Sequence, residues 1–366
     1  MIFEKRHSEM LKGIAILMMM FHHLFGFRSW IADENMYHCI FAGNTILFAV
    51  ASYCKVCVGI FIFITGYALY LKKENYLDLC GRVFRFLKKY WIIYFLFILI
   101  GWAAREPLPG ITIAIRQMFG FSTMTGYGGG NESIHPVFAW YVSIYITFIL
   151  TAPLWQKLCR YNPMTDFILC FGLANTVSVC LRNQDIIPLS STLRSFIFLY
   201  ASYVPVGMLG YIFAKYSVFG KIKVNQENNV LSLCFLILIL VISVIIRFSL
   251  QERFGLYISM GGVSFDFIFI MINILCWQII TEKYLKPVLK YTLSFLGKHS
   301  NNMWLLHGLL FTPNKTFQGI FYSLKYPFLI FVFSVIFILG MSVIIEKTER
   351  YVYDLIHQGR IFIANT

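Results

Sequence analysis

The sequence predicts an all-α polytopic membrane protein with about ten transmembrane helices, and three observations carry this prediction. Hydrophobic residues make up 58% of the chain and charged residues only 13%, whereas a soluble domain contains about 25% charged residues. Apolar stretches close to the roughly 20 residues that a helix needs to cross a bilayer recur along all 366 residues. The connections between them are alternately rich and poor in basic residues, which is typical of a membrane topology.

The apolar stretches define the expected spans. The ten predicted spans are residues 11–27, 56–71, 89–103, 137–155, 165–181, 196–214, 230–248, 261–280, 300–311 and 326–345. The ninth is short, so we expect it to be tilted or partly re-entrant. Residues 39–53 and 111–121 are also apolar, and we expect these two pieces to be interfacial or re-entrant.

The distribution of basic residues predicts that both termini are cytoplasmic. With this orientation, 21 of the 31 Lys and Arg residues fall in cytoplasmic segments and 10 fall outside, as the positive-inside rule requires. The first span has a basic flank but no small-residue cleavage site, so we expect a retained helix rather than a signal peptide. The remaining length is used by helices and short connections, which predicts one membrane domain over residues 1–366 without a fused extracellular domain.

Charge and cysteine content exclude other classes of protein. The formal net charge of +14 is accounted for by topology, so we expect no nucleic-acid partner. The nine cysteines are odd in number and lie mostly within or beside apolar runs, which argues against a disulfide framework. Cys54 and Cys57 form a single CxxC pair, which is weak evidence for a metal or redox site. We therefore expect no metal.

The first predicted helix carries a buried histidine in line with a lysine. Lys12 and His23 are eleven residues apart, which places them on one helix face with an axial separation of about 16 Å, while His22 points about 80° away. Ionisable groups inside a membrane are costly and usually functional. His23 is therefore a candidate general base, and the alternative is a structural histidine bonded to a neighbouring helix.

The second and third predicted helices add a small-residue motif and a set of cations. Thr65 and Gly66 stand in mid-membrane within a phenylalanine-rich run, where small residues let helices pack closely. Arg82, Arg85 and Lys89 share one helix face. Three cations at the membrane surface suit a ligand phosphate, and the alternative is topology combined with anionic lipid binding.

Later segments supply further polar candidates. An aromatic pair, Trp140 and Tyr141, opens the fourth span, where such a pair is normally an interfacial anchor. His135 ends a long glycine-rich loop, and a loop of that length is either functional or a connector. Asp266 is the clearest carboxylate within a predicted span, and His307 is another buried histidine in the ninth. Asp266 could orient a histidine or close a hydrogen-bond network.

Taken together, these motifs resemble the acyltransferase-3 family of bacterial membrane O-acyltransferases. The family signature of a basic residue, ten residues and a histidine matches Lys12 and His23, with Glu9 as the preceding acidic residue. Residues 61–66 resemble its phenylalanine-rich Ser-Gly motif, with Ile for the second Phe and Thr for Ser. Three further motifs match in order: the two-arginine motif at Arg82 and Arg85, the Trp-Tyr segment at 140–141, and the glycine-to-histidine segment at 297–307.

The resemblance implies transfer of an acyl group, by default acetyl, from acyl-coenzyme A to a hydroxyl of a cell-surface or lipid-linked carbohydrate at the bacterial plasma membrane. The transfer would be direct or proceed through an acyl-histidine. Residues implied for catalysis are Glu9, His23 as general base, Asp266 and His307. Residues implied for binding acetyl-CoA are Lys12, Thr65, Arg82, Arg85 and Lys89. Residues implied for binding the carbohydrate are His135, Trp140 and Tyr141.

Two other classes of function remain open at this point. A transporter of a glycan or lipid-linked sugar would share the span count and the buried polar groups but would need no coenzyme site. A membrane receptor or structural protein would use His23 and Asp266 only as packing groups. Many members of the family carry a fused extracellular esterase-like domain, and we expect this chain to act without one or with a separate protein.

Overall fold

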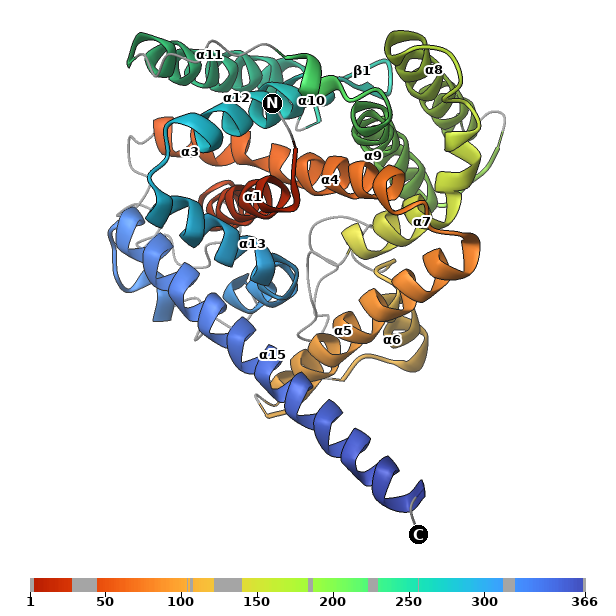
Figure 1. Cartoon of the computed structure of the whole chain (residues 1–366), viewed down its shortest axis with the longest axis vertical. Helices are drawn as coiled ribbons and strands as arrows, with labels where there is room; N and C mark the ends of the chain where they lie inside the picture. The colour runs from red at the N-terminus through yellow and green to blue at the C-terminus, as the bar shows by residue number, and fades with distance from the viewer. Residues whose placement is uncertain are drawn as a thin grey trace.

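The structure is a computed structural model that describes residues 3–27, 45–103, 105, 108–121, 140–183, 187–222, 230–255, 257–311 and 320–364. Within these ranges the chain is a bundle of helices with a single short hairpin, β1 (Ser259–Met260) and β2 (Val263–Ser264) (Figure 1). The helices are α1 (Lys5–Phe25), α3 (Thr45–Tyr53), η2 (Cys54–Val56), α4 (Cys57–Lys72), α5 (Tyr76–Ala103), α6 (Ile111–Met118), α7 (Trp140–Gln156), α8 (Pro163–Arg182), α9 (Ser191–Lys215), α10 (Val218–Lys221), α11 (Val230–Phe254), α12 (Phe267–Lys283), α13 (Pro287–Leu306), η4 (His307–Phe311) and α15 (Pro327–Ala364).

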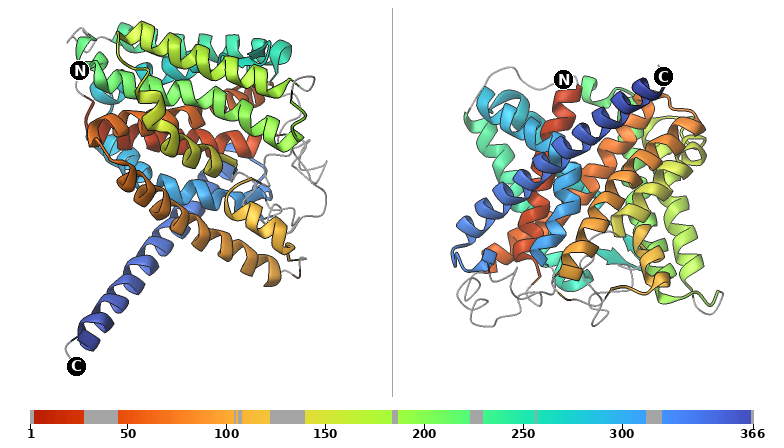
Figure 2. Two further views of the ribbon diagram at one scale, coloured as in Figure 1. Left: turned by 90° about the vertical axis from the view of Figure 1, so that its right-hand side faces the viewer. Right: turned by 90° about the horizontal axis from the view of Figure 1, so that it is seen from below.

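Hydropathy and burial of the helices confirm an α-helical multi-span membrane protein. Among the described residues, five helical segments are long and apolar enough to cross a bilayer, namely Thr45–Lys72, Pro163–Arg182, Ser191–Lys215, Val230–Phe254 and Pro327–Tyr351. Each of the ten predicted spans overlaps a helix, and the helices of the third and ninth spans, α5 and α13, begin 13 residues earlier than residues 89 and 300. The count of ten crossings and the cytoplasmic termini stay predictions. The start of α1 and the end of α15 lie at the same end of the bundle, and the C-terminal part of α15 projects sideways out of the bundle (Figure 2).

Two further differences from the predicted spans have a physical explanation, and buried charge explains the first. Residues 45–53 are not an interfacial piece, because α3, η2 and α4 form one apolar segment, Thr45–Lys72. Lys55 interrupts the apolar run in the sequence, but its ammonium is buried beside Asp266. The predicted span 261–280 also begins too early. Gly261 and Gly262 adopt φ of 58° and 80° in the hairpin turn, a conformation that glycine tolerates, and α12 begins only at Phe267.

Helix α1 lies at the centre of the bundle and packs directly against α13 (Figure 1). A Cβ atom at Gly13 would lie 2.1 Å from the Leu293 carbonyl oxygen, and one at Gly297 would lie 1.8 Å from the Glu9 carbonyl oxygen. Glycine is therefore what allows the two backbones to touch. Glu9 contacts Ser294 near the start of α1, and His23 contacts His307 near its end. The two helices therefore run parallel.

A second glycine contact joins α4 to α9. A Cβ atom at Gly66 would lie 1.7 Å from the Gly207 carbonyl oxygen, and one at Gly210 would lie 2.0 Å from the Phe63 carbonyl oxygen. The motif of small residues in the second predicted span thus forms a helix-packing seam. Because α4 also contacts α1, this seam connects α9 to the α1–α4 contact.

Gly66→Ala is expected to destabilise the bundle because the added methyl group meets backbone that cannot move aside alone. Overpacking of this kind costs about 1–3 kcal/mol, so the unfolding temperature of the purified protein in detergent should fall by several degrees. Gly172→Ala is the matched control, because a Cβ atom there has no heavy atom within 4 Å. An unchanged unfolding temperature for Gly66→Ala would contradict the close approach of α4 and α9.

Candidate active site

The centre of the candidate site is a pair of buried histidines from α1 and η4. His307 Nε2 lies 3.0 Å from His23 Nδ1, and the ring centroids are 4.7 Å apart. His23 is 8% exposed and His307 is fully buried. The structure thus brings together two of the predicted catalytic residues that are 284 positions apart in the sequence.

The hydrogen bonds of this pair assign the tautomer of each ring. His307 Nδ1 faces the backbone carbonyl of Trp304, which can only accept, so Nδ1 carries the proton and His307 Nε2 is the acceptor in a neutral ring. His23 Nδ1 therefore donates to His307 Nε2, which leaves the unprotonated nitrogen of a neutral His23 ring at Nε2, and the backbone carbonyl of Met19 is a further acceptor for the His23 ring. A neutral imidazole held in this way has the form of a general base whose orientation a second residue fixes.

His22, the neighbouring histidine on α1, serves a different contact. His22 Nδ1 lies 2.8 Å from the Ala51 carbonyl oxygen in α3, whereas His23 contacts His307. The angular offset predicted from helix geometry is therefore visible in the choice of partners. Only His23 lies on the face of α1 that meets the end of α13.

A run of aromatic side chains connects the histidine pair to Arg82. Trp304, whose carbonyl oxygen contacts His307, packs edge-on against Tyr141 with ring centroids 5.2 Å apart. Tyr141 packs near Tyr145, at 6.3 Å between centroids, and the Tyr145 hydroxyl accepts a hydrogen bond from Arg82 Nε at 3.2 Å. Two predicted site residues, Tyr141 and Arg82, thus join the histidine pair through two aromatic residues that sequence analysis did not single out.

Of the four cations predicted to bind the donor, the structure brings Lys12 and Arg82 near each other. Lys12 is half-buried and lies within electrostatic range of Arg82. Arg82 also pairs with Glu74 at 2.9 Å, and its side chain is 17% exposed. Arg85 is exposed on the next turn of α5. Lys89 lies 3.8 Å from Glu349 of α15, so this lysine makes a contact between helices.

Three other predicted residues make the contacts described here with residues other than the histidine pair. Glu9 accepts a hydrogen bond from Ser294 at 2.5 Å, at the Lys12 end of α1. The Thr65 hydroxyl donates to the Phe61 carbonyl oxygen of its own helix at 2.9 Å. Trp140 packs against Tyr203 of α9. The roles of Glu9, Thr65 and Trp140 in catalysis or binding stay predictions.

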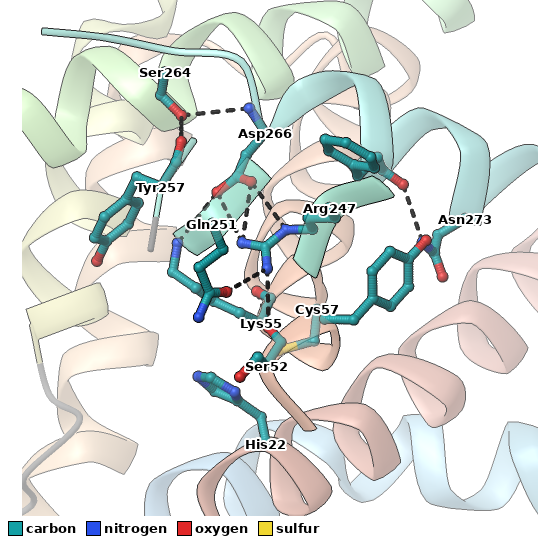
Figure 3. A network of polar contacts seen from close by, with 12 residues as sticks. His22, Ser52, Lys55, Cys57, Arg247, Gln251, Tyr257, Ser264, Asp266 and Asn273 are labelled. Atoms are coloured by element: carbon teal, nitrogen blue, oxygen red, sulfur yellow. Dashed lines mark hydrogen bonds and ion pairs between the residues drawn. The ribbon is translucent and has the colours of Figure 1, made fainter. Parts of the chain in front are cut away.

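Asp266 belongs to a separate ionic cluster and not to the histidine pair (Figure 3). It occupies the N-cap position of α12 rather than the interior of a span. Its carboxylate lies 3.2 Å from Lys55 Nζ and 3.1 Å from Arg247 Nε. Arg247 Nη1 also donates to the Ser52 carbonyl oxygen at 3.0 Å. Ser52 is adjacent to Ala51, whose carbonyl oxygen contacts His22. The cluster therefore supports the end of α1 that carries His23.

His135 lies outside the described residues. Tyr145, Trp304 and Glu74 also contact the predicted site residues and were not predicted from the sequence, although two of them carried a signal. Tyr145 follows Tyr141 by four positions, which places both rings on one face of α7. Trp304 lies three residues before His307, one helical turn away.

Comparison with known proteins gives one match. The model of the acyltransferase-3 family, described as an acyltransferase domain, matches residues 8–347. No curated protein and no solved structure gives a significant match to the chain. The matched range contains the histidine pair, the aromatic run and the cations of α1 and α5.

Proposed function

Because the chain belongs to the acyltransferase-3 family, we propose that it transfers an acetyl group from acetyl-CoA to a hydroxyl of a cell-surface or lipid-linked carbohydrate. The chain is a multi-span membrane acyltransferase, and the donor, the acceptor and the bacterial plasma membrane as its location are parts of the proposal. The single observation that carries it is the contact between His23 and His307. It supplies an oriented base for deprotonating a hydroxyl.

The proposed reaction uses His23 Nε2 as the base. This nitrogen accepts the proton of the acceptor hydroxyl while the hydroxyl oxygen attacks the thioester carbonyl carbon. A carbon–oxygen bond forms, the carbon–sulfur bond breaks, and the proton passes to the leaving thiolate. Throughout, His23 Nδ1 can keep donating to His307 Nε2, so that His307 stabilises the transient imidazolium without exchanging a proton.

The cations at the other end of α1 are the proposed binding site for the donor. Lys12, Arg82 and Arg85 would hold the phosphates of the coenzyme, since guanidinium and ammonium groups bind phosphate well. Lys12 and His23 are separated by about 16 Å along the helix, a distance that an extended pantetheine arm can span. In this arrangement the donor phosphates would lie on the cytoplasmic side and the acetyl group near the histidine pair.

The acceptor would meet the acetyl group at the His23 end of the bundle. Tyr141 is buried against Trp304 next to His307, and Trp140 opens the same helix. Aromatic faces of this kind pack well against sugar rings. We propose that Trp140, Tyr141 and His135 contribute to the carbohydrate site.

The test is transfer of label from radioactive acetyl-CoA to glycans in membranes that contain the protein. Lys12→Ala and Arg85→Ala are each expected to raise the KM for acetyl-CoA about tenfold, the loss of one charge-assisted contact. Lys157→Ala is the matched control, because Lys157 is an exposed lysine at the end of α7. Absence of labelled glycan with the wild-type chain would reject the acyltransferase proposal and favour the transporter.

A further inference from the structure

Glu74 is an acidic residue among the cations assigned to the donor, and none of the roles above uses it. Its Oε2 lies 2.9 Å from Arg82 Nη1, and its Oε1 lies 3.8 Å from Lys72 Nζ. The Glu74 side chain is only 11% exposed, although Lys72 beside it is 61% exposed. The carboxylate is therefore enclosed at a point where the chain otherwise lies at the surface.

The turn between α4 and α5 directs Glu74 to this place. Lys73 follows α4 with a φ of 48°, in the left-handed region that residues other than glycine rarely adopt. This residue ends the helix and reverses the chain, so that the next residue, Glu74, faces α5. There it meets Arg82, eight positions further along the chain.

Arg82 is held on two edges of its guanidinium. Nε donates to the Tyr145 hydroxyl at 3.2 Å, and Nη1 donates to Glu74 at 2.9 Å. A guanidinium recognises carboxylate and phosphate with the same fork of N–H donors. In the described part of the chain, Glu74 is the anion that pairs with the Arg82 guanidinium. Lys12 lies within electrostatic range of the same guanidinium.

We propose that the Glu74 carboxylate occupies the position of a donor phosphate and releases Arg82 when the donor binds. This inference rests on the proposed function and names one determinant of its donor specificity. A carboxylate and a phosphate repel one another at one guanidinium, so the two compete for Arg82. A doubly charged phosphate outcompetes the singly charged carboxylate, whereas a donor without a phosphate at this point gains nothing by displacing it.

The experiment measures binding of coenzyme A to the purified full chain in detergent. Glu74→Gln removes the competing charge and is expected to lower the Kd for coenzyme A about three- to tenfold, the range that loss of one partly buried ion pair gives. Asp78→Asn is the matched control, because Asp78 is an exposed carboxylate four residues away whose hydrogen-bond partner among the described residues is Asn75. The control should keep the wild-type Kd within about twofold.

Two further comparisons separate competition from a structural role. In an Arg82→Gln background, Glu74→Gln should bring no gain in affinity, because there is no guanidinium left to compete for. Acetyl-pantetheine, which lacks the phosphates, should bind Glu74→Gln and wild-type protein equally. Thermal unfolding with and without coenzyme A distinguishes loss of fold from loss of affinity. Glu74→Asp is a second variant, which keeps the charge on a shorter side chain and should give an intermediate gain in affinity for coenzyme A.

The outcomes separate this inference from the proposed function. Tighter binding by Glu74→Gln, absent in the Arg82→Gln background, supports the competition. Equal or weaker binding by Glu74→Gln, with wild-type protein that binds and transfers normally, overturns the inference and leaves the acyltransferase in place. If wild-type protein binds neither coenzyme A nor acetyl-CoA, the proposed function and the inference fall together.

Discussion

His23→Ala is expected to lower the rate of acetyl transfer by about 10²–10⁴-fold, the contribution typical of a positioned general base. The Kd for acetyl-CoA should stay within about twofold of wild type, because the proposed phosphate site lies about 16 Å away along α1. The measurement is the initial rate of label transfer at saturating acetyl-CoA, alongside direct binding. A variant that keeps the full rate would remove His23 from the mechanism.

The contact between the His23 and His307 imidazoles predicts how substitutions of the two residues combine. Groups that act as a unit lose their effects non-additively, so His23→Ala combined with His307→Ala should be no slower than His23→Ala alone. His22→Ala is the matched control, since His22 is buried on the same turn and bonds the Ala51 carbonyl oxygen. Equal losses of rate in folded His22→Ala and His23→Ala would show that burial, and not proton transfer, is what these histidines supply.

The position of His23 on its helix could be predicted from the sequence, but its partner could not. Helix geometry relates residues a few turns apart, so it placed Lys12 and His23 on one face. The contact with His307 depends on how α1 and α13 approach, and Gly13 and Gly297 set that distance through backbone contacts. Gly297 was visible as part of a motif, yet the sequence does not state which helix it would meet.

The role of Asp266 shows a different gap between sequence and structure. A carboxylate inside an apolar segment suggested a group that orients a histidine, because the expected span began at residue 261. The hairpin occupies the start of that segment and leaves Asp266 at the N-terminus of α12. Its partners, Lys55 and Arg247, come from η2 and α11. The burial of these two charges follows only from tertiary packing.

The aromatic run explains why the cations and the histidines could be predicted as separate motifs but not as one site. Arg82 and Tyr145 contact each other across α5 and α7, and Phe86 packs on Tyr145 at 4.4 Å between ring centroids. Aromatic residues make up 18% of the chain, so their presence in a span carries little information. Only the packing of α5 against both α7 and α13 selects the few that join the two ends of the proposed site.

Asp266→Asn is expected to destabilise the protein by about 3–5 kcal/mol, the usual consequence of removing one partner from a buried ionic group. The substitution keeps the shape of the side chain but leaves the charges of Lys55 and Arg247 without their carboxylate. Arg247 is fully buried and Lys55 is 5% exposed, so water cannot take the place of the missing carboxylate charge. The unfolding temperature in detergent should fall on the order of ten degrees, at about 2–3 degrees per kcal/mol for a long chain.

Two comparisons decide whether this loss comes from unpaired charge. Asp354→Asn makes the same chemical change at an exposed site in α15 and should leave the unfolding temperature within about one degree, as surface substitutions do. The triple variant Lys55→Met, Arg247→Met and Asp266→Leu should regain most of the lost stability, because apolar groups can replace a buried ionic cluster at little cost.

The same triple variant tests whether the cluster also affects the rate. Since Arg247 also binds the Ser52 carbonyl oxygen beside the partner of His22, the triple variant should fold yet transfer acetyl more slowly than wild type. A stable triple variant with the full rate would limit the cluster to stability, and a stable Asp266→Asn variant would contradict the buried ionic contacts.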